Sequence, residues 1–261
     1  MQVIDYNVIT LRGKRYIEFP FMEKFGIKLM LSSSDAYRSF DAPEEKILDL
    51  SAAYGYFGTN KDWVFSGYQR HGTNIEIIKS LENYPKGSDE YFGFEFENTD
   101  GLMTRGHFTL LTKFADCTPV VIFDPKNKVL CNLHSGWRGT QQKISPKAVQ
   151  LLIEGFGSDP KELIVFMGPA LGAEDFEVGD DLIELFNDSH DDISSYLIKK
   201  NKEKSLFDMT SLLKDDLLSL GILEEHIFTT HLSTFKNPLM HSYRRDGDES
   251  GRMLLFARIL D

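Results

Sequence analysis

Three side chains of the sequence, His71, Cys117 and His134, have the types and settings that could do chemistry. A thiolate and two imidazoles are common zinc ligands, and a site with three protein ligands keeps a fourth position for water or substrate. Zinc in such a site polarises a bound water or phosphate oxygen and lowers the pKa of water to about 7. The three residues therefore predict a catalytic metal site.

Two other interpretations of these residues stay open at this point. Cys117 could attack a substrate with His134 as its base, which is the arrangement of a cysteine nucleophile. The thiol and the two imidazoles could also be buried, hydrogen-bonded groups without a catalytic role. The three positions lie far apart in the sequence, so their spacing alone does not choose among these interpretations.

Arg138 lies in a glycine-rich segment, between Gly136 and Gly139, just before a predicted helix. Backbone N–H groups at the start of a helix favour an anion, and a guanidinium binds phosphate or carboxylate through a fork of donors. Arg244 and Arg245 form a second basic group near the C-terminus. We expect the three arginines to contribute to substrate binding, with structural ion pairs as the alternative.

Short apolar runs predict the strands that hold the three metal-ligand candidates. The runs 119–123 and 129–133 have the length of buried strands, and they lie just after Cys117 and just before His134. If the two strands are antiparallel neighbours, those two residues lie at the same end of the pair. Further strand patterns cover 16–22, 27–31, 63–68, 75–79, 107–113, 163–167 and 253–260.

Helical spacing predicts four helices. Apolar residues recur at helical intervals up to Phe156, and Gly157 ends that helix. Pro146 falls inside the pattern, so the helix either begins with Ser145 as its N-cap or begins near Thr140 and kinks. The other helices are predicted over 43–55, 180–186 and 210–220.

Strands and helices interleave along the chain, which is typical of α/β or mixed α+β proteins. Several strands follow one another without a helix, so we expect a mixed central sheet with flanking helices. No linker or internal repeat divides the sequence, and we expect a single domain over 1–261.

The composition limits the classes of partner. Lys and Arg number 29 and Asp and Glu number 40, which gives a net charge of −11 at pH 7. This acidic balance argues against a protein that binds duplex nucleic acid, which needs a basic stripe, but it allows a local basic pocket. No apolar stretch reaches the length of about 18 residues that a membrane span needs, and no signal-peptide pattern opens the chain. We expect a cytoplasmic protein without nucleic-acid or membrane partners; the sequence carries no indication of an oligomeric state.

Several widespread catalytic motifs are absent. The sequence has no glycine-rich dinucleotide motif, Walker lysine loop, paired-cysteine zinc motif, zinc-protease helix or serine-hydrolase elbow. The seven histidines include no His-x-His pair, which the copper cluster of a multicopper oxidase would need. An electron-relaying copper centre is therefore not expected.

Seven short motifs together resemble the family long labelled multicopper polyphenol oxidases or laccase-domain proteins. They appear in the family's order from about residue 63 to the end, and their combination is specific. The motifs are Gln69-x-His71-Gly72, Ala115-Asp116-Cys117-x-Pro119, His134-Ser135-Gly136-Trp137-Arg138-Gly139-Thr140, Gly168-Pro169-Ala170-x-Gly172, Phe176-Glu177-Val178-Gly179, Ser242-Tyr243-Arg244-Arg245-Asp246-Gly247 and Gly251-Arg252-Met253.

The resemblance implies an α/β fold in which His71, Cys117 and His134 bind zinc and form the catalytic set. It also implies activity on purine nucleosides, namely phosphorolysis of adenosine, inosine and methylthioadenosine, and deamination of adenosine. Copper-dependent phenol oxidation and a peptidoglycan-editing role are attached to some members.

The sequence departs from the family pattern mainly near its start. An Arg and two Gly of a family motif are absent near 32–35, and a Ser-Leu-Asn motif reads Ser39-Phe40-Asp41. Residues 1–42 are therefore treated as a divergent N-terminal segment within the domain. A late Cys-Thr pair of the family reads Ser233-Thr234, outside the predicted metal set.

The leading hypothesis is a zinc-dependent purine nucleoside phosphorylase and adenosine deaminase, with a purine nucleoside and phosphate as partners. Arg138 would hold phosphate. Asp100 and Asp116 are candidates for the general acid, although strand alternation can turn Asp116 away from Cys117. The alternatives are a Cys-dependent amidase or hydrolase acting on peptidoglycan fragments, a copper-dependent polyphenol oxidase, and a nucleoside-binding protein without turnover.

Overall fold

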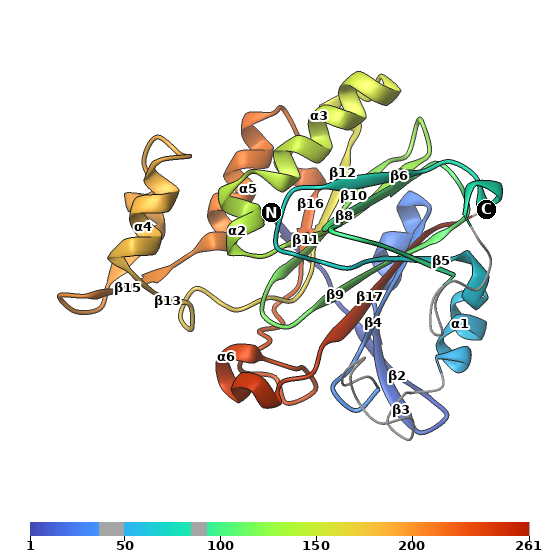
Figure 1. The fold of residues 1–261 in the computed structure, drawn as a ribbon, viewed down its shortest axis with the longest axis horizontal. Helices are drawn as coiled ribbons and strands as arrows, with labels where there is room; N and C mark the ends of the chain where they lie inside the picture. The colour runs from blue at the N-terminus through green and yellow to red at the C-terminus, as the bar shows by residue number, and fades with distance from the viewer. Residues whose placement is uncertain (37–49, 85–92, 261) are drawn as a thin grey trace.

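The computed structural model of the chain describes residues 1–36, 50–84 and 93–260, and its strands form three sheets (Figure 1). The first sheet has seven strands in the order β1-β16-β12-β10-β11-β8-β6 and mixes parallel with antiparallel pairs. Its strands are β1 (Gln2–Val3), β6 (Ile75–Ile78), β8 (Gly101–Thr104), β10 (Thr118–Asp124), β11 (Val129–Ser135), β12 (Ile164–Met167) and β16 (Ile227–Thr229).

The second sheet also has seven strands, in the order β2-β3-β4-β17-β9-β5-β7. Its strands are β2 (Asn7–Leu11), β3 (Lys14–Glu18), β4 (Ile27–Ser32), β5 (Val64–Gly67), β7 (Phe94–Phe96), β9 (Thr109–Phe114) and β17 (Met253–Ile259). A small third sheet consists of β13 (Glu177–Gly179), β15 (Lys204–Phe207) and β14 (Leu197–Lys199), in that order.

One hydrophobic core lies between the two large sheets. Val121 and Phe123 of β10 pack there with side chains of the second sheet, such as Leu255 of β17. Val120 and Ile122 point to the opposite face of β10 and pack under helices. Because both faces of β10 are covered, its sequence is an unbroken apolar run rather than an alternating one.

Helices cover the outer faces of both large sheets. α3 and α5 pack on the first sheet, and α1 packs on the second. α4 and the third sheet form a lobe at one end of the molecule, at the left of Figure 1. No helix within the described residues is long and apolar enough to cross a membrane. The helices are α1 (Ser51–Phe57), α2 (Trp137–Gln141), α3 (Ile144–Phe156), α4 (Asp180–Asn187), α5 (Met209–Ser219) and α6 (Tyr243–Asp246).

The mixed α/β class predicted from the sequence is confirmed, but the strands build two large sheets instead of one central sheet. The antiparallel pairing of the two central strands is also confirmed, with Pro119 of β10 opposite His134 of β11. The helix predicted over 43–55 falls largely outside the described residues, whose α1 begins at Ser51.

Two local predictions were wrong. The strand predicted over 16–22 ends at Glu18, since Pro20 begins a 3-10 turn over Pro20–Phe25 and a proline cannot donate to a strand ladder. The helix around Pro146 begins at Ile144, neither with Ser145 as its N-cap nor near Thr140. Lys143, with φ 63, separates α2 from α3, and Pro146 occupies the first turn of α3, where no intrahelical N–H partner is needed.

Candidate metal centre

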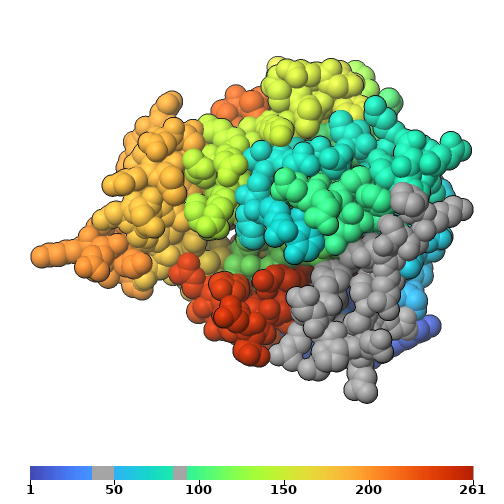
Figure 2. Space-filling model, viewed as in Figure 1, coloured from blue at the N-terminus to red at the C-terminus, as the bar shows by residue number. Residues whose placement is uncertain are grey.

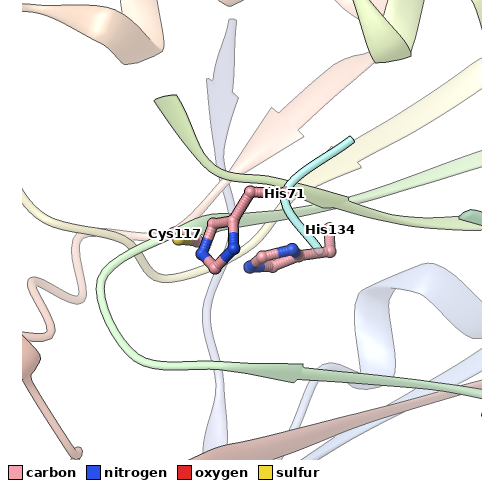
Figure 3. A group of neighbouring side chains, drawn as sticks. All are labelled: His71, Cys117 and His134. Carbon is pink, nitrogen blue, oxygen red and sulfur yellow. The ribbon is translucent and has the colours of Figure 1, made fainter. Parts of the chain in front are cut away.

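His71, Cys117 and His134 converge at one end of the β10–β11 pair (Figure 3). Cys117 directly precedes β10 and His134 lies near the end of β11, so the antiparallel register brings them together. His71 lies in the loop between β5 of the second large sheet and β6 of the first. One ligand atom from each residue lies within 4.8 Å of the other two, as a shared metal ion would require.

The buried carboxylate of Asp100 holds both histidines. Its Oδ1 accepts hydrogen bonds from the backbone N–H of His71 and from Nδ1 of His134, both at 2.9 Å. Its Oδ2 accepts from the backbone N–H of Arg70 at 3.0 Å and of Gly72 at 2.9 Å. A carboxylate only accepts, so Nδ1 of His134 carries a proton and Nε2 is the nitrogen left for a metal.

The backbone around the site is adapted to bring the three ligands close. His71 has φ 60, a left-handed conformation that non-glycine residues seldom adopt. Gly136 follows β11, and a Cβ atom there would lie 2.9 Å from Cys117 Sγ and 2.9 Å from Cδ2 of His71. Gln69 ties the loop to β9, because its side chain bonds both the N–H and the carbonyl of Lys113. These close contacts leave no room for a side chain at position 136.

The electrostatics of the metal-free site favour a thiolate. Burial alone would raise the pKa of Cys117, but the charge and hydrogen bonds of His134 and His71 outweigh it and lower that pKa to about 6. Burial would lower the pKa of His134, but the Cys117 thiolate and Asp100 raise it to about 9. Cys131, by contrast, is buried without such partners, and its pKa is raised. Cys117 is therefore the thiol suited to metal binding or to attack.

The donor set fits a catalytic metal. Thiolate and imidazole are ligands of zinc, and a three-residue set leaves a position open for substrate. His134 donates a hydrogen bond to the Asp100 carboxylate, as metal-binding histidines commonly do through the ring nitrogen that does not bind the metal. Copper also accepts such donors, so the donor set admits both metals.

The three residues lie in the wall of a cleft of about 730 Å³. Figure 2 shows a hollow on this face, between α6, coloured red, and the segments above it. Arg138 lines the cleft from the first turn of α2, with its guanidinium 4.1 Å from the ring centre of Trp137. The aromatic side chains of Tyr68 and Tyr243 also line the cleft. The structure thus brings four of the six predicted site residues to one cleft.

The other two predicted residues lie outside that cleft. Arg244 lines a neighbouring cleft of about 420 Å³, and its guanidinium donates to the carbonyl of Glu177 at 3.1 and 3.2 Å. Arg245 donates to backbone carbonyls of Thr234, Phe235 and Met240. Arg245 therefore holds the segment before α6 together, and a substrate role for either residue stays a prediction.

Neither acid considered from the sequence lines the cleft of the metal set. Asp116 has φ 78, and its carboxylate accepts hydrogen bonds from Thr234 Oγ1 and the backbone N–H of Arg244, both at 2.6 Å. Burial alone would raise the pKa of Asp100, but hydrogen bonds led by that of His134 outweigh it and lower the pKa. Asp100 is thus an ionised acceptor. From the sequence Asp100 was considered only as a general acid, because no local pattern reveals its hydrogen bonds to the two distant histidines.

Comparisons with known proteins identify the family and support the fold. The family model described as "Multi-copper polyphenol oxidoreductase laccase" matches residues 34–259. "Purine nucleoside phosphorylase YlmD" of Bacillus subtilis is 29% identical over 201 residues, 75% of this chain and 70% of that protein. "Adenosine deaminase RL5" of an unknown prokaryotic organism is 28% identical over 221 residues, 84% of this chain and 80% of that protein. The crystal structure of YlmD from Geobacillus stearothermophilus has a TM-score of 0.82 at 20% identity and covers 98% of this chain and 100% of its own, which shows the shared fold.

Proposed function

The chain belongs to the multi-copper polyphenol oxidoreductase laccase family, and we propose that it is a zinc-dependent enzyme of purine nucleosides. The proposed reactions are phosphorolysis of adenosine, inosine and methylthioadenosine, and deamination of adenosine. The observation that carries the proposal is the convergence of His71, Cys117 and His134 within 4.8 Å in the wall of an open cleft. Relatives named purine nucleoside phosphorylase and adenosine deaminase support the substrate class.

The cleft suits a nucleoside in size and lining. Its volume of about 730 Å³ lies within the usual range of small-molecule sites, roughly 300–1,000 Å³. Trp137, Tyr68 and Tyr243 offer aromatic faces against which a flat purine can pack. The metal set lies in the same cleft, so a nucleoside bound there has its reacting bonds near the metal ligands.

Each residue of the metal set has a distinct task. Cys117 supplies a thiolate, and His134 supplies Nε2 while Asp100 fixes its other nitrogen. His71 completes the set from the loop between the two large sheets. When bound, zinc supplies a Lewis acid that polarises an oxygen of water or phosphate.

Arg138 would bind the anionic substrate of phosphorolysis. Phosphate carries between one and two negative charges near neutral pH, and a protein with a net charge of −11 needs a local cation to hold it. The Arg138 guanidinium is exposed at the cleft and packs over Trp137. The guanidinium contacts Trp137 through its flat face, so its N–H groups, which lie in its plane, can donate hydrogen bonds to a phosphate.

The two reactions use the same geometry with different oxygen nucleophiles. In phosphorolysis a phosphate oxygen forms a bond to C1′ of the ribose, and the C1′–N9 bond breaks with its electron pair going to the purine, which takes up a proton. In deamination the oxygen of water adds to C6, and the amino group leaves as ammonia after taking up a proton. Both need a nucleophilic oxygen held beside the bound nucleoside.

A cysteine-dependent hydrolase acting on peptidoglycan fragments is the second candidate. The lowered pKa of Cys117 and its contact with His134 favour it, since this is the arrangement of an activated thiol nucleophile. Such an enzyme would keep its activity after chelation and lose it after alkylation of the thiol.

We further propose that the chain forms one domain over 1–261 and is located in the cytoplasm, as expected from the sequence patterns.

Product analysis tests the proposed function. Zinc-loaded protein is incubated with adenosine with and without phosphate, and the products are separated by chromatography. We expect adenine and ribose 1-phosphate only with phosphate, and inosine in both cases; a chelator should abolish all of them. Turnover of adenosine that survives complete metal removal would contradict a zinc-dependent reaction, and absence of any turnover would contradict the proposal.

A further inference from the structure

A single buried carboxylate is bonded to two of the three residues of the metal centre. Asp100 is 3% exposed and lies directly before β8, next to the strand that carries His134. It bonds the imidazole of His134 on β11 and the backbone N–H of His71 in the loop between β5 and β6. We propose that Asp100 is the positioning residue that sets the geometry of both histidines for the metal. This inference rests on the metal site of the proposed function.

The loop that carries His71 depends on the same carboxylate. Three consecutive backbone N–H groups, those of Arg70, His71 and Gly72, all point at Asp100. His71 has a left-handed backbone with φ 60, which a non-glycine residue adopts only when the surrounding contacts hold it. Without the Asp100 carboxylate, these three N–H groups lose their acceptor. We expect the turn to relax and the His71 ring to leave the ligand position.

The chemistry of the contact requires a carboxylate. Each oxygen of Asp100 accepts two of the four hydrogen bonds. Asparagine has nearly the same shape, but one of its two terminal atoms is a donor. In either orientation of an amide, two of the four donors would face an NH₂ group. Asp100→Asn therefore disturbs either the His134 ring or the Arg70–Gly72 turn while changing the volume very little.

Zinc affinity gives the first test, measured by competition with a chromophoric chelator. We expect Asp100→Asn to lower the affinity by about 10- to 100-fold, the usual effect of losing an outer partner of metal ligands. Asp124→Asn is the matched control. Asp124 is also buried, at 1% exposure, and its carboxylate also caps backbone N–H groups, those of Lys126 and Asn127, but at the opposite end of β10. The control should keep the wild-type affinity within about twofold.

A spectroscopic readout separates positioning from simple loss of stability. In zinc-loaded wild-type protein labelled with ¹⁵N-histidine, NMR should show His134 bound through Nε2 with a slowly exchanging proton on Nδ1. Asp100→Asn should speed the exchange of that proton, and Asp124→Asn should not. A mere loss of stability would lower the melting temperature without altering this signal. If Asp100→Asn does not fold, the wild-type spectrum decides, since coordination through Nδ1 would overturn the inference.

The outcomes distinguish this inference from the proposed function. Wild-type protein that binds no zinc at these residues would overturn both. Equal zinc affinity and equal Nδ1 exchange in wild type and Asp100→Asn would overturn only the positioning role. Reduced affinity in the variant, together with no turnover of nucleosides by the wild type, would support the role of Asp100 and contradict the proposed function.

Discussion

Gly136 and Cys117 approach each other so closely that a Cβ atom on Gly136 would lie 2.9 Å from Cys117 Sγ. The same atom would lie 2.9 Å from the His71 ring. Gly136 has φ −72 and ψ 171, which alanine also adopts, so the glycine is required by space and not by backbone conformation. The turn from β11 into α2 can therefore pass beside the ligands only without a side chain.

Gly136→Ala is accordingly expected to displace Cys117 or His71 and to lower both zinc affinity and kcat/KM by at least about tenfold. Gly155→Ala in α3 is the control, since a Cβ atom there meets nothing within 4 Å. That variant should keep full activity and gain about 0.5–1 kcal/mol of stability, as alanine is the better helix residue. Normal turnover of Gly136→Ala would show that the ligands do not need this space.

Replacement of the two cysteines should separate metal binding from packing. Cys117→Ala should reduce the zinc content, measured by elemental analysis, from about one per chain to near zero and abolish turnover. Cys131 is fully buried in β11, so Cys131→Ala should cost on the order of 1 kcal/mol of stability and leave turnover nearly unchanged. Equal loss of zinc in both variants, at normal folded yield, would contradict this division.

Alkylation of the metal-free protein should follow the lowered pKa of Cys117. A thiol with a pKa of about 6 is thiolate above that pH and thiol below it. The rate of iodoacetamide modification at Cys117 should therefore be near its plateau at pH 7 and fall by half near pH 6. Cys131, with its raised pKa, should stay unmodified until the protein unfolds. Mass spectrometry of peptides gives both rates; a midpoint near the ordinary thiol value of about 8.5 would contradict the assignment.

Arg138→Met should impair phosphorolysis more than deamination. A charge-assisted hydrogen bond contributes about 1.5–3 kcal/mol, which corresponds to roughly a 10- to 100-fold effect on phosphate use. We expect the phosphate KM to rise by at least about tenfold, with a much smaller effect on phosphate-independent deamination. Arg244→Met, in the neighbouring cleft, is the comparison. If Arg244→Met raises the phosphate KM and Arg138→Met does not, the anion lies in the neighbouring cleft.

The part of the site that could be predicted from the sequence depends on local patterns. The short apolar runs 119–123 and 129–133 predicted the strands that became β10 and β11, and their antiparallel pairing brings Cys117 near His134 as expected. His71 was a candidate because of its residue type and its place after a strand pattern. No local pattern predicted that its loop joins the two large sheets and brings it to Cys117 and His134.

Other features could not be predicted because they depend on contacts between distant residues. Asp116 turns away from the cleft because it bonds the backbone of Arg244, 128 positions later. Arg245 is engaged by backbone carbonyls whose positions no sequence pattern reveals. The strands of the third sheet are three or four residues long, too short to show a periodicity.

A zinc titration of activity tests the central claim most directly. Metal-free protein is supplied with increasing zinc, and formation of ribose 1-phosphate from inosine and phosphate is followed, with Cys117→Ala in parallel. We predict that activity rises linearly, stops rising at about one zinc per chain, and stays at background in Cys117→Ala. Full activity before any zinc is added, or an equal rise in Cys117→Ala, would contradict a nucleoside enzyme built on His71, Cys117 and His134.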